Sequence, residues 1–223
     1  MFNVNADMFR AAALFVSSEQ TRYYLAGVHI APHAVAGVTL TATDGHRLLC
    51  VHDESGVCDQ PEGLIVRADP VAMRKAAKRG RDETEPRRFM SESNDSPAWV
   101  THADGEQVAF FKDWRVDGSF PDWRRVMPSS DETSNAGQWY NPKLIADFVE
   151  VSKLLGDDNK PAIRIAAGDE GSPAMVRLAN VPHAFGVIMP MRGPDMAGGI
   201  PEFVNAQPAA ESEVDAAPES IAA

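Results

Sequence analysis

The basic residues between positions 67 and 88 carry the clearest chemical signal in this sequence. Eight Lys and Arg residues lie there against four acids, although the whole chain has a formal net charge of −11. Four of these bases are spaced i, i+1, i+4 and i+5 in a predicted helix and so share one face: Arg74, Lys75, Lys78 and Arg79. A cationic helix face suits contacts to a phosphate backbone, which carry no base-sequence information. A merely solvated charged face is the alternative that this spacing leaves open.

The histidines and cysteines predict neither catalysis nor metal binding. His29 and His33 are four residues apart, but Pro32 lies between them, and this is not the helical pair that a zinc site uses. His46 follows a predicted turn at Asp44 and has no nucleophile or partner constellation near it in sequence. With only two cysteines in the chain, we expect no metal site, no cofactor and no catalytic residue.

Charge and hydropathy divide the chain into a body and a tail. Residues 193–223 hold six acids and no Lys or Arg, so they carry −6 of the total of −11. Their Ala, Pro, Glu and Ser content predicts disorder. No apolar run approaches the roughly 20 residues of a membrane span, and nothing at the start reads as a targeting peptide. We therefore expect a cytoplasmic protein without membrane contact.

The body reads as three similar modules, each made of a strand, a capped helix and about three further strands. The caps Asn5, Asp69 and Asn141 are 64 and 72 residues apart, and Pro follows the second and third caps. Spacing of this kind predicts one supersecondary unit used three times. The expected helices are 6–17, from 70 onward, and 142–155. The expected strands are 2–4, 23–30, 38–43 and 47–52; 64–68, 87–91, 98–101 and 107–116; and 138–140, 162–166, 174–178 and 184–190.

Domain boundaries follow from these modules. The first two modules, about 1–58 and 61–128, are expected to form one complete domain. Residues 129–137 are polar and turn-rich and predict a linker. Residues 138–192 then form half a domain, and the acidic tail is 193–223.

Four strings in the body carry a more specific signal than the patterns above. Arg22 to Gly27 (RYYLAG) and Ala42 to Leu48 (ATDGHRL) are similar to the middle domain of the bacterial DNA polymerase III beta subunit, the beta sliding clamp. Gly118 to Pro128 (GSFPDWRRVMP) is similar to the end of that domain, and Val187 to Arg192 (VIMPMR) to the clamp's C-terminus. The resemblance covers about residues 1–192.

This resemblance implies an α+β DNA clamp fold, with helices on one face of curved antiparallel sheets. In the family, six such domains close a ring whose helices face duplex DNA. The clamp's first domain and the first half of its last domain are missing from this chain. Three modules per chain and twelve per ring suggest four chains, so a homo-oligomer is expected.

The resemblance also implies a hydrophobic cleft that binds linear motifs of polymerases and other DNA-processing proteins. Methionine and leucine walls accept apolar anchors, and polar groups at the rim fix a peptide backbone. A purely structural role for these residues remains the alternative. The implied cleft residues are Leu25, Thr43, Gly45, His46, Arg47, Leu48, Pro128, Val187, Met189, Pro190 and Met191.

Two functions remain open at this point. One is a non-enzymatic processivity factor that binds duplex DNA without sequence preference and tethers a polymerase or repair enzyme. A clamp loader is then a further candidate partner, and the protein is expected to associate with the nucleoid when on DNA. The other is a binding module without a ring that competes for or bridges clamp-binding motifs. The basic helix favours the first, with expected DNA contacts from Arg10, Arg74, Lys75, Lys78, Arg79, Arg81, Lys143 and Lys153.

Overall fold

A computed structural model of the chain describes residues 1–78, 83–102, 104–127, 138–156, 161–166 and 171–193. Residues 1–192 form one compact unit. The expected disorder of the tail and the linker at 129–137 lie outside the described residues. The division of the body into a domain and a half-domain remains a prediction.

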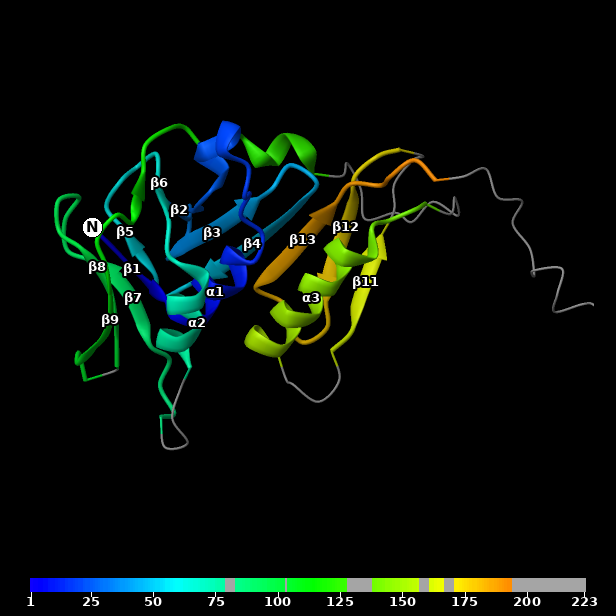
Figure 1. Cartoon of the computed structure of the whole chain (residues 1–223). Coiled ribbons are helices and arrows are strands. Elements are labelled where there is room, and N and C mark those ends of the chain that lie inside the picture. Colours follow the sequence, from blue (N-terminus) through cyan, green and yellow to red (C-terminus); the bar gives the residue numbers. More distant parts are fainter. Residues whose placement is uncertain (79–82, 103, 128–137, 157–160, 167–170, 194–223) are drawn as a thin grey trace, which may run out of the picture. The chain divides into compact units, whose positions relative to one another are not determined.

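Two antiparallel sheets carry the described strands (Figure 1). The smaller sheet has the order β5-β1-β7-β8-β9, and the larger has the order β10-β6-β2-β3-β4-β13-β12-β11. The strands of the smaller sheet are β1 (Phe2–Asn5), β5 (Val57–Cys58), β7 (Arg88–Ser91), β8 (Ala98–Thr101) and β9 (Gln107–Phe111). Those of the larger sheet are β2 (Val28–Pro32), β3 (Val38–Thr43), β4 (Arg47–Asp53), β6 (Leu64–Val66), β10 (Arg115–Val116), β11 (Ile163–Ala166), β12 (Ala174–Leu178) and β13 (Ala184–Ile188).

The helices begin where the sequence predicts, because each cap side chain accepts backbone N–H groups. Asn5 Oδ1 accepts from Asp7 and Met8 at 2.9 and 3.2 Å, and the Asp69 and Asn141 side chains cap the other two helices in the same way. The helices are α1 (Ala6–Ala13), α2 (Pro70–Ala77) and α3 (Pro142–Leu155); two 3₁₀ helices are η1 (Gln20–Leu25) and η2 (Trp123–Val126).

The third module joins the first through one continuous sheet. Strand β13 pairs antiparallel with β4, so that Val187 lies opposite Leu48. Figure 1 shows α3 lying over β11, β12 and β13. Phe148 of α3 packs so closely on β13 that a Cβ at Gly186 would lie 2.1 Å from its ring, and glycine is therefore required there.

Alternation along the central strands gives the larger sheet two different faces. Leu49 and Val51 of β4 belong to the main core under the helices. Leu48 and Cys50 point to the opposite face, where they form a small separate cluster with Val187. The candidate functional site lies on this second cluster.

Several predicted elements were wrong in their bounds. Helix α1 ends at Ala13 rather than near residue 17, because the Ser17 N–H donates to the Leu25 carbonyl at 2.9 Å instead of continuing the helix. Residues 23–25 are 3₁₀ helix, so the next strand starts only at Val28.

The single strand expected at 107–116 is two strands in different sheets. Trp114 is buried between them and donates its indole N–H to the Ser96 carbonyl at 2.8 Å, while β10 turns away to pair with β6. Residues 138–140 form only an isolated bridge, from Trp139 to Met191. The short strand β5, which pairs with β1, was not predicted.

Helix α2 is shorter than the basic stripe that was expected on it. It ends at Ala77, and Lys78 already has an extended backbone conformation. Only Arg74 and Lys75 of the predicted four bases therefore lie on the helix. Arg79 and Arg81 lie outside the described residues.

Candidate functional site: an apolar cleft at the β4–β13 junction

The floor of the site is the pair Leu48 and Val187, which lie opposite each other where β4 meets β13. Both side chains are nearly fully buried. The Trp123 ring of η2 packs against this pair, and its centroid lies 6.0 Å from that of Phe185. Because one floor residue comes from each module, the site exists only when the third module is joined to the first.

The β3–β4 turn forms one wall and is held rigidly by its own side chains. Asp44 Oδ1 accepts the His46 and Arg47 N–H groups at 2.9 and 3.0 Å, and the Thr43 hydroxyl donates to the Arg47 carbonyl at 2.7 Å. Gly45 has a φ of +90°, which favours glycine. The side chains of the string ATDGHRL therefore build and hold this turn.

The turn is also bonded to the third module, since the Met189 N–H donates to the His46 carbonyl at 2.8 Å. The opposite wall is η2 and the residues before it. The β3–β4 turn, the third module and η2 together enclose a cavity of about 160 Å³. Its lining residues are Leu25, Thr43, Gly45, His46, Arg47, Leu48, Pro121, Asp122, Trp123, Val126, Val187 and Met189.

Eight of the eleven predicted cleft residues line this cavity. Pro128 lies outside the described residues. Pro190 and Met191 do not line it; Met191 is 51% exposed, and its N–H donates to the Trp139 carbonyl at 2.8 Å. The η2 wall was not predicted, although apolar Trp123 and Val126, spaced i, i+3 shortly after Pro121, were a signal for it.

Arg47 lines the cavity, yet its guanidinium group belongs to the helix side of the sheet. It donates to the carbonyl oxygens of Leu14 at 3.1 Å and Leu144 at 3.2 Å, and it pairs with Asp44 and Asp147. The same group lies 4.5 Å from the centre of the Phe15 ring. Arg47 therefore joins the first module to α3 beneath the cleft, a role that the sequence did not reveal.

Cys50 lies behind the floor and is buried; both cysteines are free. Burial raises the pKa of the Cys50 thiol, and the Thr41 hydroxyl donates to its sulfur at 3.5 Å. The thiol is therefore protonated at neutral pH and serves as an apolar packing group.

His29 fixes the segment that leads into η2. Its ring stacks on Phe120 with centroids 4.8 Å apart, and its Nε2 lies 3.2 Å from the Glu62 carbonyl oxygen. Its Nδ1 is buried without a hydrogen-bond partner among the described residues. Burial is the main cause that lowers the pKa of His29, with the Arg124 charge acting in the same direction.

Acidification is therefore expected to destabilise the protein through His29. The unfolded chain takes up this proton near pH 6.5 while the folded state still resists it, so the free energy of unfolding falls as the pH drops through that value. A His29→Phe variant is expected to lose less stability between pH 7.5 and 5.5, by at most about 1 kcal/mol per pH unit. Urea titrations across this range measure the effect, and an unchanged pH dependence in the variant contradicts it.

Five of the predicted DNA-contacting residues lie on the three helices, where α1 contacts both α2 and α3. They are Arg10, Arg74, Lys75, Lys143 and Lys153. Arg10 and Arg74 line one cavity of about 360 Å³ together with Glu150. Lys75 and Lys143 are exposed. Lys153 is bonded to Glu150 at 2.8 Å, which offsets its charge. The positive charge of this helix layer therefore comes from Arg10, Arg74, Lys75 and Lys143.

Among the described residues, no group of three or more His, Cys, Asp or Glu is placed to hold a metal ion. No helix in the described part of the chain is long and apolar enough to cross a membrane.

The arrangement of the helices and sheets is that of a clamp fold, and comparison with known proteins gives similarity to beta sliding clamps. Over 122 residues the chain is 32% identical to the beta sliding clamp of Caulobacter vibrioides, a match that covers 51% of this chain and 29% of that protein. No protein-family model matches.

Solved clamp structures show the same fold over most of the body. The sliding clamp (DNA polymerase III subunit beta) of Bartonella birtlesii, solved with griselimycin bound, has a TM-score of 0.58 at 21% identity and covers 86% of this chain and 66% of that one. The clamp of Pseudomonas aeruginosa has a TM-score of 0.60 at 18% identity, covering 85% and 65%. The resemblance to the beta sliding clamp and the α+β clamp fold are thus confirmed, while the chain spans less than a third of its curated relative.

Proposed function

We propose that this chain is a non-enzymatic DNA tether of the sliding-clamp type, which holds a polymerase or another DNA-processing enzyme on duplex DNA. The observation that carries the proposal is the floor of the cleft, where Leu48 and Val187 meet across the β4–β13 junction. Residues from the first and the third module thus come together in this one site. Its overall likeness to DNA polymerase sliding clamps gives the site its context.

The chemistry of the cleft suits an extended peptide with apolar anchors. The floor is apolar, Met189 provides an adaptable wall, and a cavity of about 160 Å³ has room for one or two side chains. The polar turn at Thr43 to His46 lies at the rim, where it can bond a peptide backbone. Binding of this kind concentrates its energy in a few anchors.

The helix layer supplies the proposed DNA contact. Arg10 and Arg74 line one cavity on this layer and Lys75 is exposed, so their charge can reach phosphates. Such contacts are independent of base sequence and weaken with salt, as movement along DNA requires. The protein is proposed to work in the cytoplasm as a homo-oligomer, without a cofactor, and with a clamp loader if its ring needs opening.

A binding module without a ring is the second candidate. The early end of α2 at Ala77 favours this candidate, because fewer bases lie on the helix than were predicted from the sequence. Such a module would bind clamp-binding motifs through the same cleft but would not bind DNA. DNA binding therefore separates the two candidates.

Peptide affinity tests the cleft. A fluorescent peptide with the clamp-binding motif of a bacterial replicative polymerase is expected to bind saturably, as measured by anisotropy. Met189→Lys, at a 38% exposed wall position, is expected to weaken binding at least about 30-fold, the loss of one hot-spot anchor. Val35→Lys, at an 88% exposed position that does not line the cavity, is the matched control. Equal affinities for the two variants contradict the proposed site.

A further inference from the structure

The cavity between the three helices is built from one face of each helix. Helix α1 contributes Arg10 and Ala13 together with its last cap, Leu14, at the i, i+3 and i+4 positions that share a helix face. Helix α3 contributes Glu150 and Leu154, which are four residues apart. Because α1 contacts both α2 and α3, side chains of all three modules surround one common space.

Helix α2 provides both a buried wall and the mouth of this cavity. Met73 is 1% exposed, whereas Val71 is 51% exposed and Arg74 is exposed next to it. The cavity has a volume of about 360 Å³, against about 160 Å³ for the cleft at the β4–β13 junction. Pockets that bind small molecules have volumes of about 300 to 1,000 Å³. The helix cavity is therefore large enough for a whole small molecule.

Two guanidinium groups and one carboxylate line the cavity, and they come from three different helices. Arg10 belongs to α1, Arg74 to α2 and Glu150 to α3. The Glu150 carboxylate already accepts a hydrogen bond from Lys153 Nζ at 2.8 Å, which offsets its charge. The charge around the cavity is therefore positive. Guanidinium groups bind carboxylates and similar anions through paired N–H donors.

The apolar lining restricts the class of ligand further. Five of the lining residues are aliphatic or thioether side chains: Ala13, Leu14, Val71, Met73 and Leu154. A phosphate backbone has no apolar part that could fill this space, and a neutral apolar molecule would leave the two guanidinium groups without an anion. A ligand with an apolar body and one anionic group matches both parts of the lining.

We propose that this cavity binds a small organic anion, with an apolar body of the size of a medium-chain or two-ring acid and a single carboxylate or sulfonate group. The anionic group pairs with Arg10 and Arg74, and the apolar body packs against Met73 and Leu154. The flexible Met73 side chain adapts to the shape of the ligand. No residue lines both this cavity and the cleft at the β4–β13 junction, so the two sites are distinct.

Occupation of the cavity is expected to control DNA binding. The ligand would occupy Arg10 and Arg74, which are the same two side chains that are proposed to contact phosphates, so ligand and duplex are expected to compete. This competition rests on the proposed function, whereas the binding of the ligand itself does not.

Two fluorescent probes with the same apolar body test the site in the full-length protein. Anilinonaphthalene sulfonate carries one anionic group, and its neutral parent, phenylnaphthylamine, lacks that group. The anion is expected to bind saturably and at least about tenfold more tightly than the neutral probe, because hydrogen bonds between ionised groups are the stronger ones. Arg74→Gln is expected to remove most of this preference. Equal affinities of the wild type for the two probes, or no saturable binding of the anion, overturn the proposal.

A bulky side chain at the mouth tests where the probe binds. Val71→Trp is expected to weaken the binding of both probes at least about tenfold, because the indole ring takes up the space of the apolar body. Val57→Trp, at a 48% exposed position that does not line the cavity, is the matched control. Circular dichroism checks that both variants remain folded. Anion binding that survives Val71→Trp, or that an excess of the clamp-binding peptide displaces, overturns the proposed location.

Decanoate then tests the connection to DNA. It is expected to displace the sulfonate probe and to weaken duplex binding by the wild type in low salt, but not duplex binding by Val71→Trp. Unchanged duplex affinity in saturating decanoate contradicts the competition. A wild type that binds duplex but no probe would overturn the inference and leave the proposed function standing. A wild type that binds the probe but no duplex would leave the site standing and contradict the proposed function.

Discussion

Replacing Arg47 with methionine is expected to lower the free energy of unfolding by about 3 kcal/mol, within the range for breaking a buried ion pair. Methionine keeps the apolar stem of the side chain but loses the guanidinium group. The carbonyl oxygens of Leu14 and Leu144 then lose a charged donor, and Asp147 loses its partner. A buried acceptor left without its donor carries its full desolvation cost.

The loss is expected to reach the cleft as well, because Arg47 connects the first module to α3 directly beneath the β4–β13 junction. Peptide affinity should therefore fall together with stability, although the guanidinium is bonded on the opposite face of the sheet. Thermal unfolding should shift downward by about 10 °C for a chain of this size.

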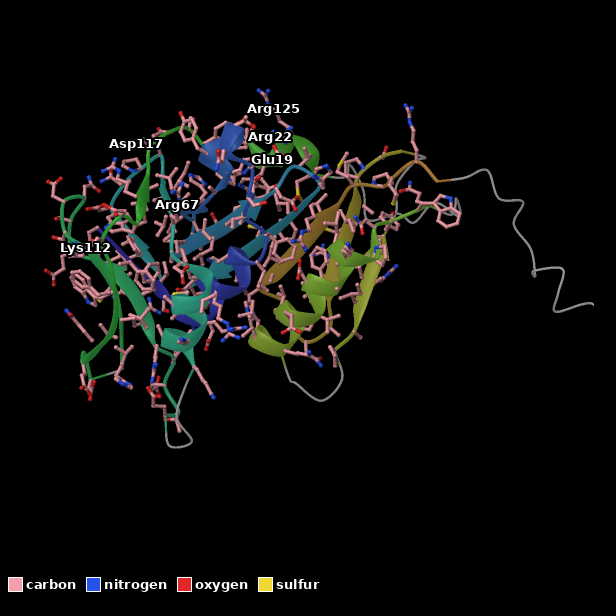
Figure 2. All side chains as sticks on the ribbon, viewed as in Figure 1. Glu19, Arg22, Arg67, Lys112, Asp117 and Arg125 are labelled. Atoms are coloured by element: carbon pink, nitrogen blue, oxygen red, sulfur yellow. The ribbon has the colours of Figure 1, made fainter. Side chains whose placement is uncertain are left out.

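Arg125→Met is the matched control. Arg125 pairs with Asp122 at 3.4 Å, but its side chain is 85% exposed (Figure 2), and such surface pairs contribute little. Urea unfolding of both variants measures the difference. Equal stabilities for the Arg47 and Arg125 variants would show that the buried network does not hold the third module in place.

Reversing two charges on the helix layer is expected to have the second large effect. The double variant Arg10→Glu with Arg74→Glu places two acids beside Glu150, where the wild type has two bases. Affinity for a fluorescent duplex at 50 mM salt is expected to fall at least about tenfold. The slope of log affinity against log salt should become shallower by about 2, because each phosphate contact contributes about 0.9.

The control for this experiment changes the net charge by the same amount elsewhere. Lys112, on the loop after β9, and Arg125, on η2, lie away from α1, α2 and α3 (Figure 2). The double variant Lys112→Glu with Arg125→Glu is therefore expected to keep most of the affinity. Similar losses in the two double variants would mean that net charge alone, not the helix layer, controls DNA binding. No measurable binding by the wild type would favour the module without a ring.

Local signals in the sequence predicted most of the fold. Capping residues followed by an apolar helical period predicted α3 with its observed bounds, 142–155, and alternation around Asp44-Gly45 predicted the β3–β4 hairpin. The predicted bounds were wrong where tertiary contacts determine the end of an element. Helix α1 ends early because its last turn meets Arg47 and η1, and residues 107–116 divide because Trp114 is buried between two sheets.

The cleft was predictable only in part. The eight predicted residues that line the cavity all lie in strings that resemble the clamp. They come from η1, the end of β3, the β3–β4 turn, β4, β13 and the residue after β13. The η2 wall was missed because a short 3₁₀ helix leaves little periodicity. The role of Arg47 was hidden because its partners Leu144 and Asp147 lie about a hundred residues away in sequence.

Bridging of a partner to DNA tests the proposed tether most directly. A clamp-binding peptide is fixed to beads, and a fluorescent duplex is added with or without the protein in low salt. The wild type is expected to retain the duplex on the beads, and both Met189→Lys and the Arg10/Arg74 double reversal are expected to abolish retention while leaving the other activity intact. Retention that survives either variant, or a peptide-bound wild type that retains no duplex, would contradict a tether that joins an enzyme to DNA.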